Sequence, residues 1–267
     1  MITYPIGLLS QKVSSFDTDA QAFITAASIT DTTQQNAIND LVVSLKDNSL
    51  WTKMNAIYPI VGGAASSHKY NLKDPQDTDG AFRLTFNGTV THSSGGMLGD
   101  GSTGFANTHF IPSSELTDEK LHLSFYSRTN ITAFAIDIGA RGTVGTTKDS
   151  FFTLRGGSGN SGFRINLGAD ILLADTDSLG FYMASRESIN LQKAYKNNSF
   201  VGQNTSVSTS ITDVPIYILG LNNNGSLSNQ SIRQCAFASM GEELNSTDAL
   251  NLYTIVNDYQ TALSRNV

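Results

Sequence analysis

Glutamate side chains are the first place to look for chemistry in this chain, because two carboxylates about 5 Å apart can serve as nucleophile and general acid in sugar hydrolysis. The glutamates are Glu115, Glu119, Glu187, Glu242 and Glu243. Glu115 and Glu119 lack an intervening aspartate placed on a strand. Glu242 and Glu243 are adjacent, so in a strand their side chains would face opposite sides. The paired carboxylates of a hydrolase are therefore missing, and we expect no catalytic residue and no enzyme activity.

Histidine and cysteine offer no metal or nucleophile site either. His68, His92, His109 and His122 are far apart in sequence and lack zinc spacing, and no serine stands in a G-x-S-x-G elbow. Cys235 is the single cysteine, so no intrachain disulfide can form, and its place in a strand pattern predicts a buried, small apolar residue. The sequence predicts no cofactor, no metal and no ligand-binding residue that can be named.

Two polar loops have alternative interpretations. Asp74–Gly80 holds three aspartates and a glycine, and a calcium ion between Asp74 and Asp79 would use such oxygens. The spacing is not that of an EF-hand, and Asp-Pro and Asp-Gly are ordinary turn formers, so we favour a turn. Gly95–Gly104 is predicted to be a loop, and its glycines do not follow the dinucleotide-binding pattern.

The run Lys120–Arg128 alternates as a strand does. One face carries Leu121, Leu123, Phe125 and Ser127. On the other, His122, Tyr126 and Arg128 could line a groove, although a cover of N-terminal helices over this face explains them as well and is favoured.

Helical spacing marks both ends of the chain. Asp17 or Thr18 can cap a first helix and Asp31 a second, each with a glutamine at the capping-box offset. A third short helix is predicted from Asn48 or Ser49 to Pro59, with Trp51 in the core rather than stacked on a sugar. Asn245 is the expected cap of the last helix, which we expect to lie across an open end or face of the strands.

Between these ends the pattern is that of short antiparallel strands. The predicted runs before residue 170 are Lys69–Lys73, Ala81–Asn87, Thr89–Ser93, Lys120–Arg128, Ala133–Gly139, Ser150–Arg155 and Phe163–Leu167. Arg155–Gly162 is a flexible turn between two of them. Four more runs lie between Leu179 and Met240, and Tyr195–Gly202 is a tight hairpin, because Asn197 and Asn198 tolerate positive φ.

Composition describes a globular protein with few charges. The 267 residues are 39% hydrophobic and 15% charged, with a net charge of −6. The lysines and arginines are scattered, which is not the basic footprint of a nucleic-acid-binding protein. No apolar run is long enough to span a membrane, and the first ten residues do not resemble a signal peptide.

Several sequence segments of the predicted strands together resemble a known family. Four of them are Leu179-Gly-Phe-Tyr-Met-Ala-Ser-Arg186, Tyr195-Lys-Asn-Asn-Ser-Phe-Val-Gly202, Ile216-Tyr-Ile-Leu-Gly220 and Ala236-Phe-Ala-Ser239. Further segments lie in Leu50–Gly63, Lys69–Pro75, Thr91–Ser94 and Leu121–Asn130. Together they resemble a concanavalin A-like, laminin-G-like domain of tailed-bacteriophage virion proteins, over the chain from about Asp19 to the end.

The resemblance implies a mainly β chain, built as an antiparallel jelly-roll sandwich with an N-terminal helical segment and one C-terminal helix. The expected parts are an arm of residues 1–16 for virion attachment, a small helical segment of residues 17–63, the sandwich at 64–243 and a helix at 244–267. The E-x-D-x-x-E strand of this fold's hydrolases is missing.

Function then follows from the resemblance rather than from a motif. It implies a non-enzymatic fibre, knob or decoration protein on the exterior of a phage particle, made in the host cytoplasm, whose sandwich binds host-surface glycan. The alternatives are a purely structural module without a ligand and, least favoured, a polysaccharide-degrading enzyme. The expected partners are other virion proteins through residues 1–16, copies of the chain itself (a trimer being one option) and host polysaccharide, with neither nucleic acid nor membrane insertion.

Overall fold

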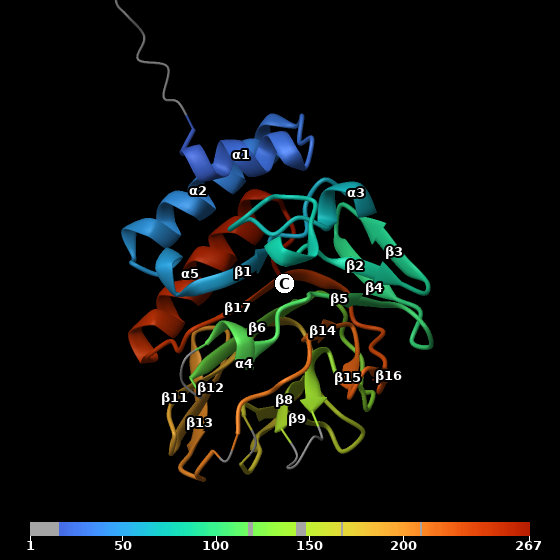
Figure 1. Cartoon of the computed structure of the whole chain (residues 1–267), viewed down its shortest axis with the longest axis vertical. Helices are drawn as coiled ribbons and strands as arrows, with labels where there is room; N and C mark the ends of the chain where they lie inside the picture. The colour runs from blue at the N-terminus through green and yellow to red at the C-terminus, as the bar shows by residue number, and fades with distance from the viewer. Residues whose placement is uncertain (1–15, 117–119, 143–147, 167, 209) are drawn as a thin grey trace, which may run out of the picture.

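Two antiparallel β-sheets and a layer of helices form the part of the chain that the structure describes (Figure 1). The computed structural model describes residues 16–116, 120–142, 148–166, 168–208 and 210–267. The predicted arm of residues 1–16 therefore lies outside the described residues, except for Phe16, which packs against the helical core. The predicted mainly β sandwich, with short N-terminal helices and one C-terminal helix, is confirmed.

The first sheet, which we call the helix-covered sheet, is centred on the last strand of the chain. Its order is β13 (Ser199–Asn204), β12 (Leu191–Lys196), β11 (Gly180–Ser188), β6 (Leu121–Ser127), β17 (Cys235–Gly241), β4 (Gly96–Gly99) and β3 (Val90–Ser93). The strand β1 (Met54–Tyr58) also pairs with β17, beside β4. Strands from both ends of the chain thus meet at β17.

The second sheet, which we call the open sheet, packs face to face against the first. Its order is β10 (Ile171–Ala174), β9 (Asn160–Arg164), β8 (Lys148–Thr153), β7 (Ile138–Gly142), β14 (Tyr217–Ile218), β5 (Phe105–Asn107) and β2 (Thr85–Asn87). A small hairpin of β15 (Leu221–Asn223) and β16 (Ser226–Ser228) joins it through β7. Its outer face carries no helix longer than one turn among the described residues.

Alternation along the strands explains why the molecule has three layers. In β6, Leu121, Leu123 and Phe125 are buried between the two sheets, whereas Tyr126 is buried on the helix side. The period of two in the sequence therefore assigns each side chain to one of two cores, as predicted. Burial on both faces makes the helix-covered sheet the middle layer.

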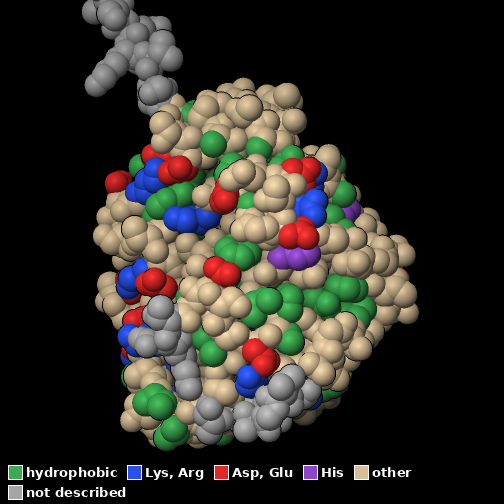
Figure 2. All heavy atoms as spheres, in the orientation of Figure 1, with side chains coloured by type: hydrophobic (Ala, Val, Ile, Leu, Met, Phe, Trp, Pro, Cys, Tyr) green, Lys and Arg blue, Asp and Glu red, His purple; other side chains and the backbone are tan. Residues whose placement is uncertain are grey.

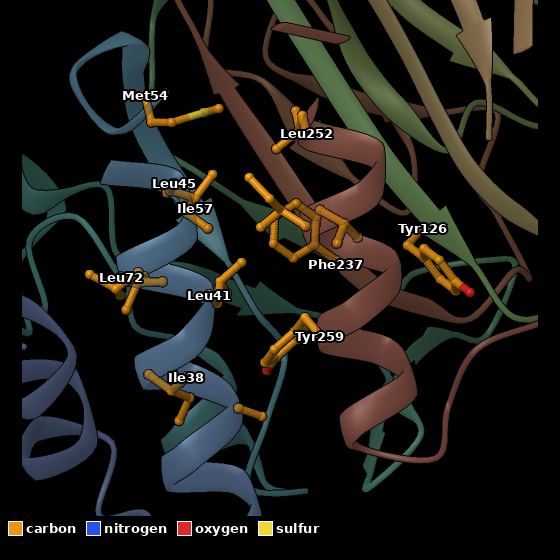
Figure 3. Close-up of a cluster of buried hydrophobic side chains, with 14 of the residues drawn as sticks. Ile38, Leu41, Leu45, Met54, Ile57, Leu72, Tyr126, Phe237, Leu252 and Tyr259 are labelled. Atoms are coloured by element: carbon orange, nitrogen blue, oxygen red, sulfur yellow. The ribbon is translucent and has the colours of Figure 1, made fainter. Parts of the chain in front are cut away.

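The helices pack their apolar stripes on that second face. The main ones are α1 (Thr18–Ala26), α2 (Thr32–Asp47) and α5 (Ser246–Ala262), and short turns occur at α3 (Ala65–His68), α4 (Pro112–Glu115), Trp51–Lys53 and Asp79–Ala81. Figure 3 shows Leu41 of α2, Phe237 of β17 and Tyr259 of α5 meeting in the helix-side core. None of the described helices is long and apolar enough to cross a membrane.

The helices begin at predicted cap residues, although the glutamines at the capping-box offset in α1 and α2 form no such box. Asp31 accepts a hydrogen bond from Gln34 N at 2.8 Å, and Asn245 accepts bonds from Thr247 N and Asp248 N. Asp248 in turn accepts a hydrogen bond from Asn245 N, so a complete capping box begins α5. The helix lies across a sheet face, one of the two predicted placements, where it packs beside α2.

The predicted third helix is wrong. Only a single turn forms at Trp51–Lys53, and residues 54–58 are strand β1. A register shift between Met54 and Ala56 places Met54 and Ile57 on the same, helix-facing side of the strand. A β-bulge thus produced the three-residue spacing that resembled a helix. Trp51 packs half-buried against the helix-side core, as expected of a core residue.

Several loop and strand assignments also change. Of the predicted strands Ala81–Asn87 and Ala133–Gly139, only residues 85–87 and 138–139 are strand. Lys69–Lys73 is not a strand but forms one isolated bridge, because the buried Asn71 amide bonds to Ile57 N and Ala81 O instead. Gly96–Gly99, predicted to be loop, is strand β4. A Cβ at Gly96 would lie 2.3 Å from the Cys235 carbonyl oxygen, so glycine is what lets β17 approach.

Candidate ligand-binding site

A large hollow lies on the outer face of the open sheet. Its volume is about 490 Å³. Its floor comes from β7 to β10 and its walls from the segment at residues 134–136, the turn between β8 and β9, and the β15–β16 hairpin. The lining residues are Phe134, Ile136, Arg141, Phe151, Thr153, Gly156, Gly157, Ser158, Asn160, Gly162, Arg164, Asp170, Leu172, Leu221 and Asn229.

The floor is built by outward-facing positions of neighbouring strands. Phe152 and Phe163 point into the core between the sheets, so Phe151 and Arg164, which pair across β8 and β9, point outward. Gly139 pairs with Phe151 on the other side, and a Cβ there would lie 2.3 Å from the Phe151 Cβ. The missing side chain at Gly139 leaves room for the aromatic ring in the floor.

Two arginines flank this ring. The Arg164 guanidinium carbon lies 5.0 Å from the centre of the Phe151 ring and that of Arg141 lies 5.8 Å from it. Both distances are within the range of cation–π contacts. The floor therefore combines one aromatic surface with planar hydrogen-bond donors on two sides.

Acidic side chains fix the two guanidinium groups. Asp149, whose side chain is 1% exposed, accepts two hydrogen bonds from Arg141, at 2.8 and 2.9 Å, and one from Arg164 at 2.8 Å. Arg164 also donates to Asp170 at 2.7 Å. These ion pairs raise the pKa of both arginines: the bond to Asp149 is the largest influence on Arg141, while burial opposes the rise at Arg164. The donors are rigidly placed and their charge is compensated.

Phe134 forms an exposed wall of the hollow. Phe134 is 68% exposed and belongs to an irregular segment without strand pairing. A buried ion pair between Arg233 and Asp137 supports this segment, because Arg233 Nη2 also donates to the carbonyl oxygens of Ile131 and Ala133, each at 3.0 Å. The wall is therefore positioned by the fold beneath it.

The turn at Arg155–Gly162, predicted to join two strands, forms the other wall. Gly156 N donates to Asn160 O at 2.7 Å, and Gly159 adopts a φ of 81°. Gly156, Gly157 and Ser158 line the hollow. The second glycine-rich segment, Gly95–Gly104, does not line it. The sequence predicts this turn, but it does not identify Phe134, Phe151 or the two arginines, because these residues form no recognisable sequence motif.

The residues that the sequence singled out for chemistry lie elsewhere. None of the described glutamates lines the hollow, and Glu119 is outside the described residues. Glu187 pairs with Lys193 at 3.0 Å at the end of β11. Among the described residues no cluster of three or more histidine, cysteine, aspartate or glutamate side chains could hold a metal ion.

Two of the three aspartates of the Asp74–Gly80 turn pair with cations of the chain itself, and Asp74 accepts a hydrogen bond from Gln76. Asp77 pairs with Lys69 and Arg83, and Asp79 pairs with Arg83. The hydrogen bond from Lys69 is the main reason that the pKa of Asp77 is lowered. With their carboxylates occupied in this way, these residues have a structural role in the turn.

His122, Tyr126 and Arg128 do not line a groove. His122 is fully buried, and its Nδ1 lies 2.6 Å from the Glu242 carbonyl oxygen; burial lowers its pKa to about 4. The Tyr126 hydroxyl accepts a hydrogen bond from Val267 N, and Arg128 donates to the C-terminal backbone. The sheet face is covered, as favoured, but these three side chains contact the C-terminal part of the chain rather than the N-terminal helices. Cys235 is likewise buried, which raises its pKa.

The composition of the hollow suits a ligand with both apolar faces and hydroxyl groups. Phe151, Phe134 and Leu172 offer apolar surface, and Leu172 is 62% exposed. Arginine, asparagine, threonine and serine side chains around them offer hydrogen bonds. This is the usual mixture of a small-molecule site, in which apolar contact gives area and few polar groups give orientation.

Neither a protein-family model nor a curated protein sequence matches the chain. Solved structures do. A mutant Trypanosoma rangeli sialidase with trans-sialidase activity matches with a TM-score of 0.52 and 9% identity, over 83% of this chain and 39% of that one. A W1252A mutant of HCR D/C VPI 5995 matches with a TM-score of 0.53 and 9% identity, over 77% of this chain and 53% of that one.

A third similar structure is one of botulinum neurotoxin type C, and its description states that cell entry of this toxin depends on interaction with two ganglioside molecules. It matches with a TM-score of 0.51 and 8% identity, over 79% of this chain and 53% of that one. The chain spans from about two fifths to about half of the length of these proteins. At such identities the similarity is one of fold, and the chain has a lectin- or glucanase-like β-sandwich fold.

Proposed function

We propose that the chain is a glycan-binding, non-enzymatic module that uses the hollow on the open sheet. The observation that carries this proposal is the outward-facing Phe151 ring between two fixed guanidinium groups, with the exposed Phe134 beside it. Sugar rings have an apolar C–H face and a rim of hydroxyl groups, and the hollow complements both. The similarity in fold to a ganglioside-dependent toxin and to a sialidase is compatible with this role.

A non-enzymatic role is supported by the chemistry of the lining. Asp170 is the carboxylate that lines the hollow, Asp149 lies beneath it, and both are hydrogen-bonded to Arg164. A hydrolase of the two-carboxylate kind needs one acid that can donate a proton and one base or nucleophile. Two carboxylates joined through a guanidinium group are poorly suited to that division of roles.

The finer proposal is a place on the exterior of a bacteriophage particle, as a fibre, knob or decoration protein. Its support is the resemblance of the sequence segments given above to those of phage virion proteins. In this proposal residues 1–16 attach the chain to other virion proteins, and several copies assemble. A single site of millimolar affinity is worth only about 4 kcal/mol, so adhesion to host polysaccharide would need such copies.

The test replaces the two aromatic side chains that line the hollow. We expect Phe151→Ala and Phe134→Ser each to weaken binding to a retained polysaccharide by roughly tenfold, because loss of an aromatic contact costs about 1 kcal/mol or more. Binding is measured by affinity electrophoresis in gels that contain one purified polysaccharide each. Phe200→Ser is the matched control, because Phe200 is 54% exposed on β13 and lies outside the hollow.

Two results would contradict the proposal. Equal binding by all three variants would place any glycan site away from the hollow. Absence of binding to host cells and to every polysaccharide, from a correctly folded oligomer, would favour the purely structural role, in which the sandwich only packs against neighbours. Release of reducing sugar ends would show an enzyme instead.

A further inference from the structure

The charges at the hollow sum to zero. Arg141, Arg164 and Asp170 line it, and Asp149 lies buried directly beneath the two arginines. The site therefore offers two positive and two negative groups to a ligand, all of them joined in one network.

Both guanidinium groups already bind carboxylates. Asp149 accepts two bonds from Arg141 and one from Arg164, and Asp170 accepts one more from Arg164. An acidic sugar would bring a third carboxylate to guanidinium groups whose charge Asp149 and Asp170 already compensate. It would either face those two carboxylates or displace Asp149, whose side chain is 1% exposed, and leave a buried charge unpaired, which is strongly unfavourable.

A hydroxyl group meets no such obstacle. It can donate to Asp170, whose side chain is 36% exposed, without removing the bond from Arg164. It can also accept from a guanidinium N–H that points away from Asp149, or bond to the Asn160 and Asn229 side chains on the walls. Ion pairs placed in this way fix the donors in space while leaving the site neutral.

We propose that the hollow takes a neutral, hydroxyl-rich sugar and discriminates against sugars that carry carboxylate or sulfate groups. This inference rests on the proposed glycan-binding function and adds the ligand class to it. It separates this site from those that recognise acidic sugars through uncompensated arginines. The net charge of −6 further disfavours a polyanionic ligand.

The experiment compares two panels of polysaccharides by affinity electrophoresis of the full chain. Dextran, mannan and galactomannan form the neutral panel; alginate, hyaluronan and heparin form the acidic one. We expect retardation by at least one neutral polysaccharide, with a dissociation constant that changes less than twofold between 20 and 200 mM salt, because uncharged contacts are not screened. Phe151→Ala should weaken this binding by roughly tenfold, because an aromatic contact is lost.

The two proposals fail in different ways. Retardation only by an acidic polysaccharide, lost in Phe151→Ala and weakened about tenfold by salt, would overturn the neutral class while leaving glycan binding intact. No retardation by either panel would overturn glycan binding and this inference with it.

Asp170→Asn tests the charge balance directly. The substitution keeps the size of a half-exposed side chain and releases one partner of Arg164. We expect weaker binding of the neutral ligand, by three- to tenfold, and new, salt-sensitive retardation by an acidic polysaccharide. Asp258→Asn, at an exposed position of α5 in the helical layer, is the control with the same change of charge. Equal behaviour of the two variants would contradict the charge-balance argument.

Discussion

Arg233 is the single residue on which the wall of the hollow most depends. It is fully buried, pairs with Asp137 at 3.2 Å and donates to three backbone carbonyl groups, of Ile131, Ala133 and Arg155. Those carbonyl groups belong to irregular backbone that no strand pairing holds. One guanidinium group thus replaces the backbone hydrogen bonds that strand pairing would supply, and it holds the segment that contains Phe134 in position.

We predict that Arg233→Met lowers the free energy of unfolding by about 3–5 kcal/mol, because Asp137 is left buried without its charge partner. Urea unfolding followed by fluorescence measures the loss. Replacing both partners, in Arg233→Met with Asp137→Leu, should recover part of the stability but not glycan binding. A loss below about 1 kcal/mol in the single variant would mean that water reaches Asp137.

At the scale of the residue, type and spacing predict burial better than they identify a ligand-binding side chain. The missing glutamate pair and the buried Cys235 follow from residue type and spacing. Phe151 could not be identified, because one outward aromatic side chain in a strand resembles any other. The value of Phe151 depends on Arg141 and Arg164, which the chain brings beside it from two other strands.

Within the open sheet, Gly139 is the position where a strand has no room for a side chain. A Cβ would come within 2.3 Å of the Phe151 Cβ and 2.5 Å of the Ser150 carbonyl oxygen, and the residue has a φ of 155°. Neither neighbouring atom is the far end of a flexible side chain. The glycine therefore lets β7 and β8 pair while Phe151 keeps its outward orientation.

Gly139→Ala should therefore destabilise the fold by more than about 1 kcal/mol and weaken binding at the hollow, because β8 must shift. Gly162→Ala is the matched control in the adjacent strand. Its Cβ would meet the Leu172 side chain at 3.5 Å, an ordinary contact distance. Melting temperatures of both variants test this. Equal melting temperatures would show that the sheet adapts at Gly139 without cost.

The elements themselves were largely predictable, and the exceptions have physical reasons. The alternation of Lys120–Arg128 and the cap at Asn245 correspond to β6 and α5. In the hairpin between β12 and β13, Asn197 alone of the two asparagines adopts positive φ, at 51°. Strand β1 was missed because a bulge imitates helical spacing, and tertiary pairing with β17 overrides the local pattern.

At the scale of the whole molecule, the three-layer arrangement decides which face is available. Helices α1, α2 and α5 cover one sheet, so the outer face of the open sheet is the broad uncovered surface among the described elements (Figure 2). Figure 2 also shows hydrophobic side chains gathered over β5 and β14 on this side. The sequence predicts both layers of strands, but it does not tell which of them the helices leave open.

The three layers also bury histidines, and this makes global stability depend on pH. His68 is 1% exposed: its Nε2 accepts a bond from Gly63 N, and its Nδ1 lies 3.0 Å from His92 Nδ1. Burial, with the nearby His92 and Arg265, lowers the pKa of His68 to about 3. For His122, burial dominates and Lys53 adds to it, while the Glu242 carbonyl and Asp248 oppose the shift.

Because both folded-state values, about 3 and about 4, lie below the value of 6.5 in the unfolded chain, the unfolded chain binds more protons between these limits. Stability should therefore be constant above pH 6.5 and fall as the pH decreases below it. At pH 5 each buried histidine should cost about 2 kcal/mol relative to pH 7.5. Urea unfolding at several pH values between 5 and 7.5 measures this, in a range above the titration of most carboxylates.

His68→Gln separates the histidine contribution from other acid effects. Glutamine can still accept from Gly63 N, yet it cannot take up a proton, so the variant should lose less stability than the native chain between pH 7.5 and pH 5. His109→Gln is the control, because His109 is partly exposed at the far edge of the open sheet and its pKa is lowered less by burial, with Asp79 opposing the shift. A native chain equally stable at both pH values would mean that water or a local opening protonates His68 without unfolding, and that the contact between α3 and β3 is looser than its hydrogen bonds indicate.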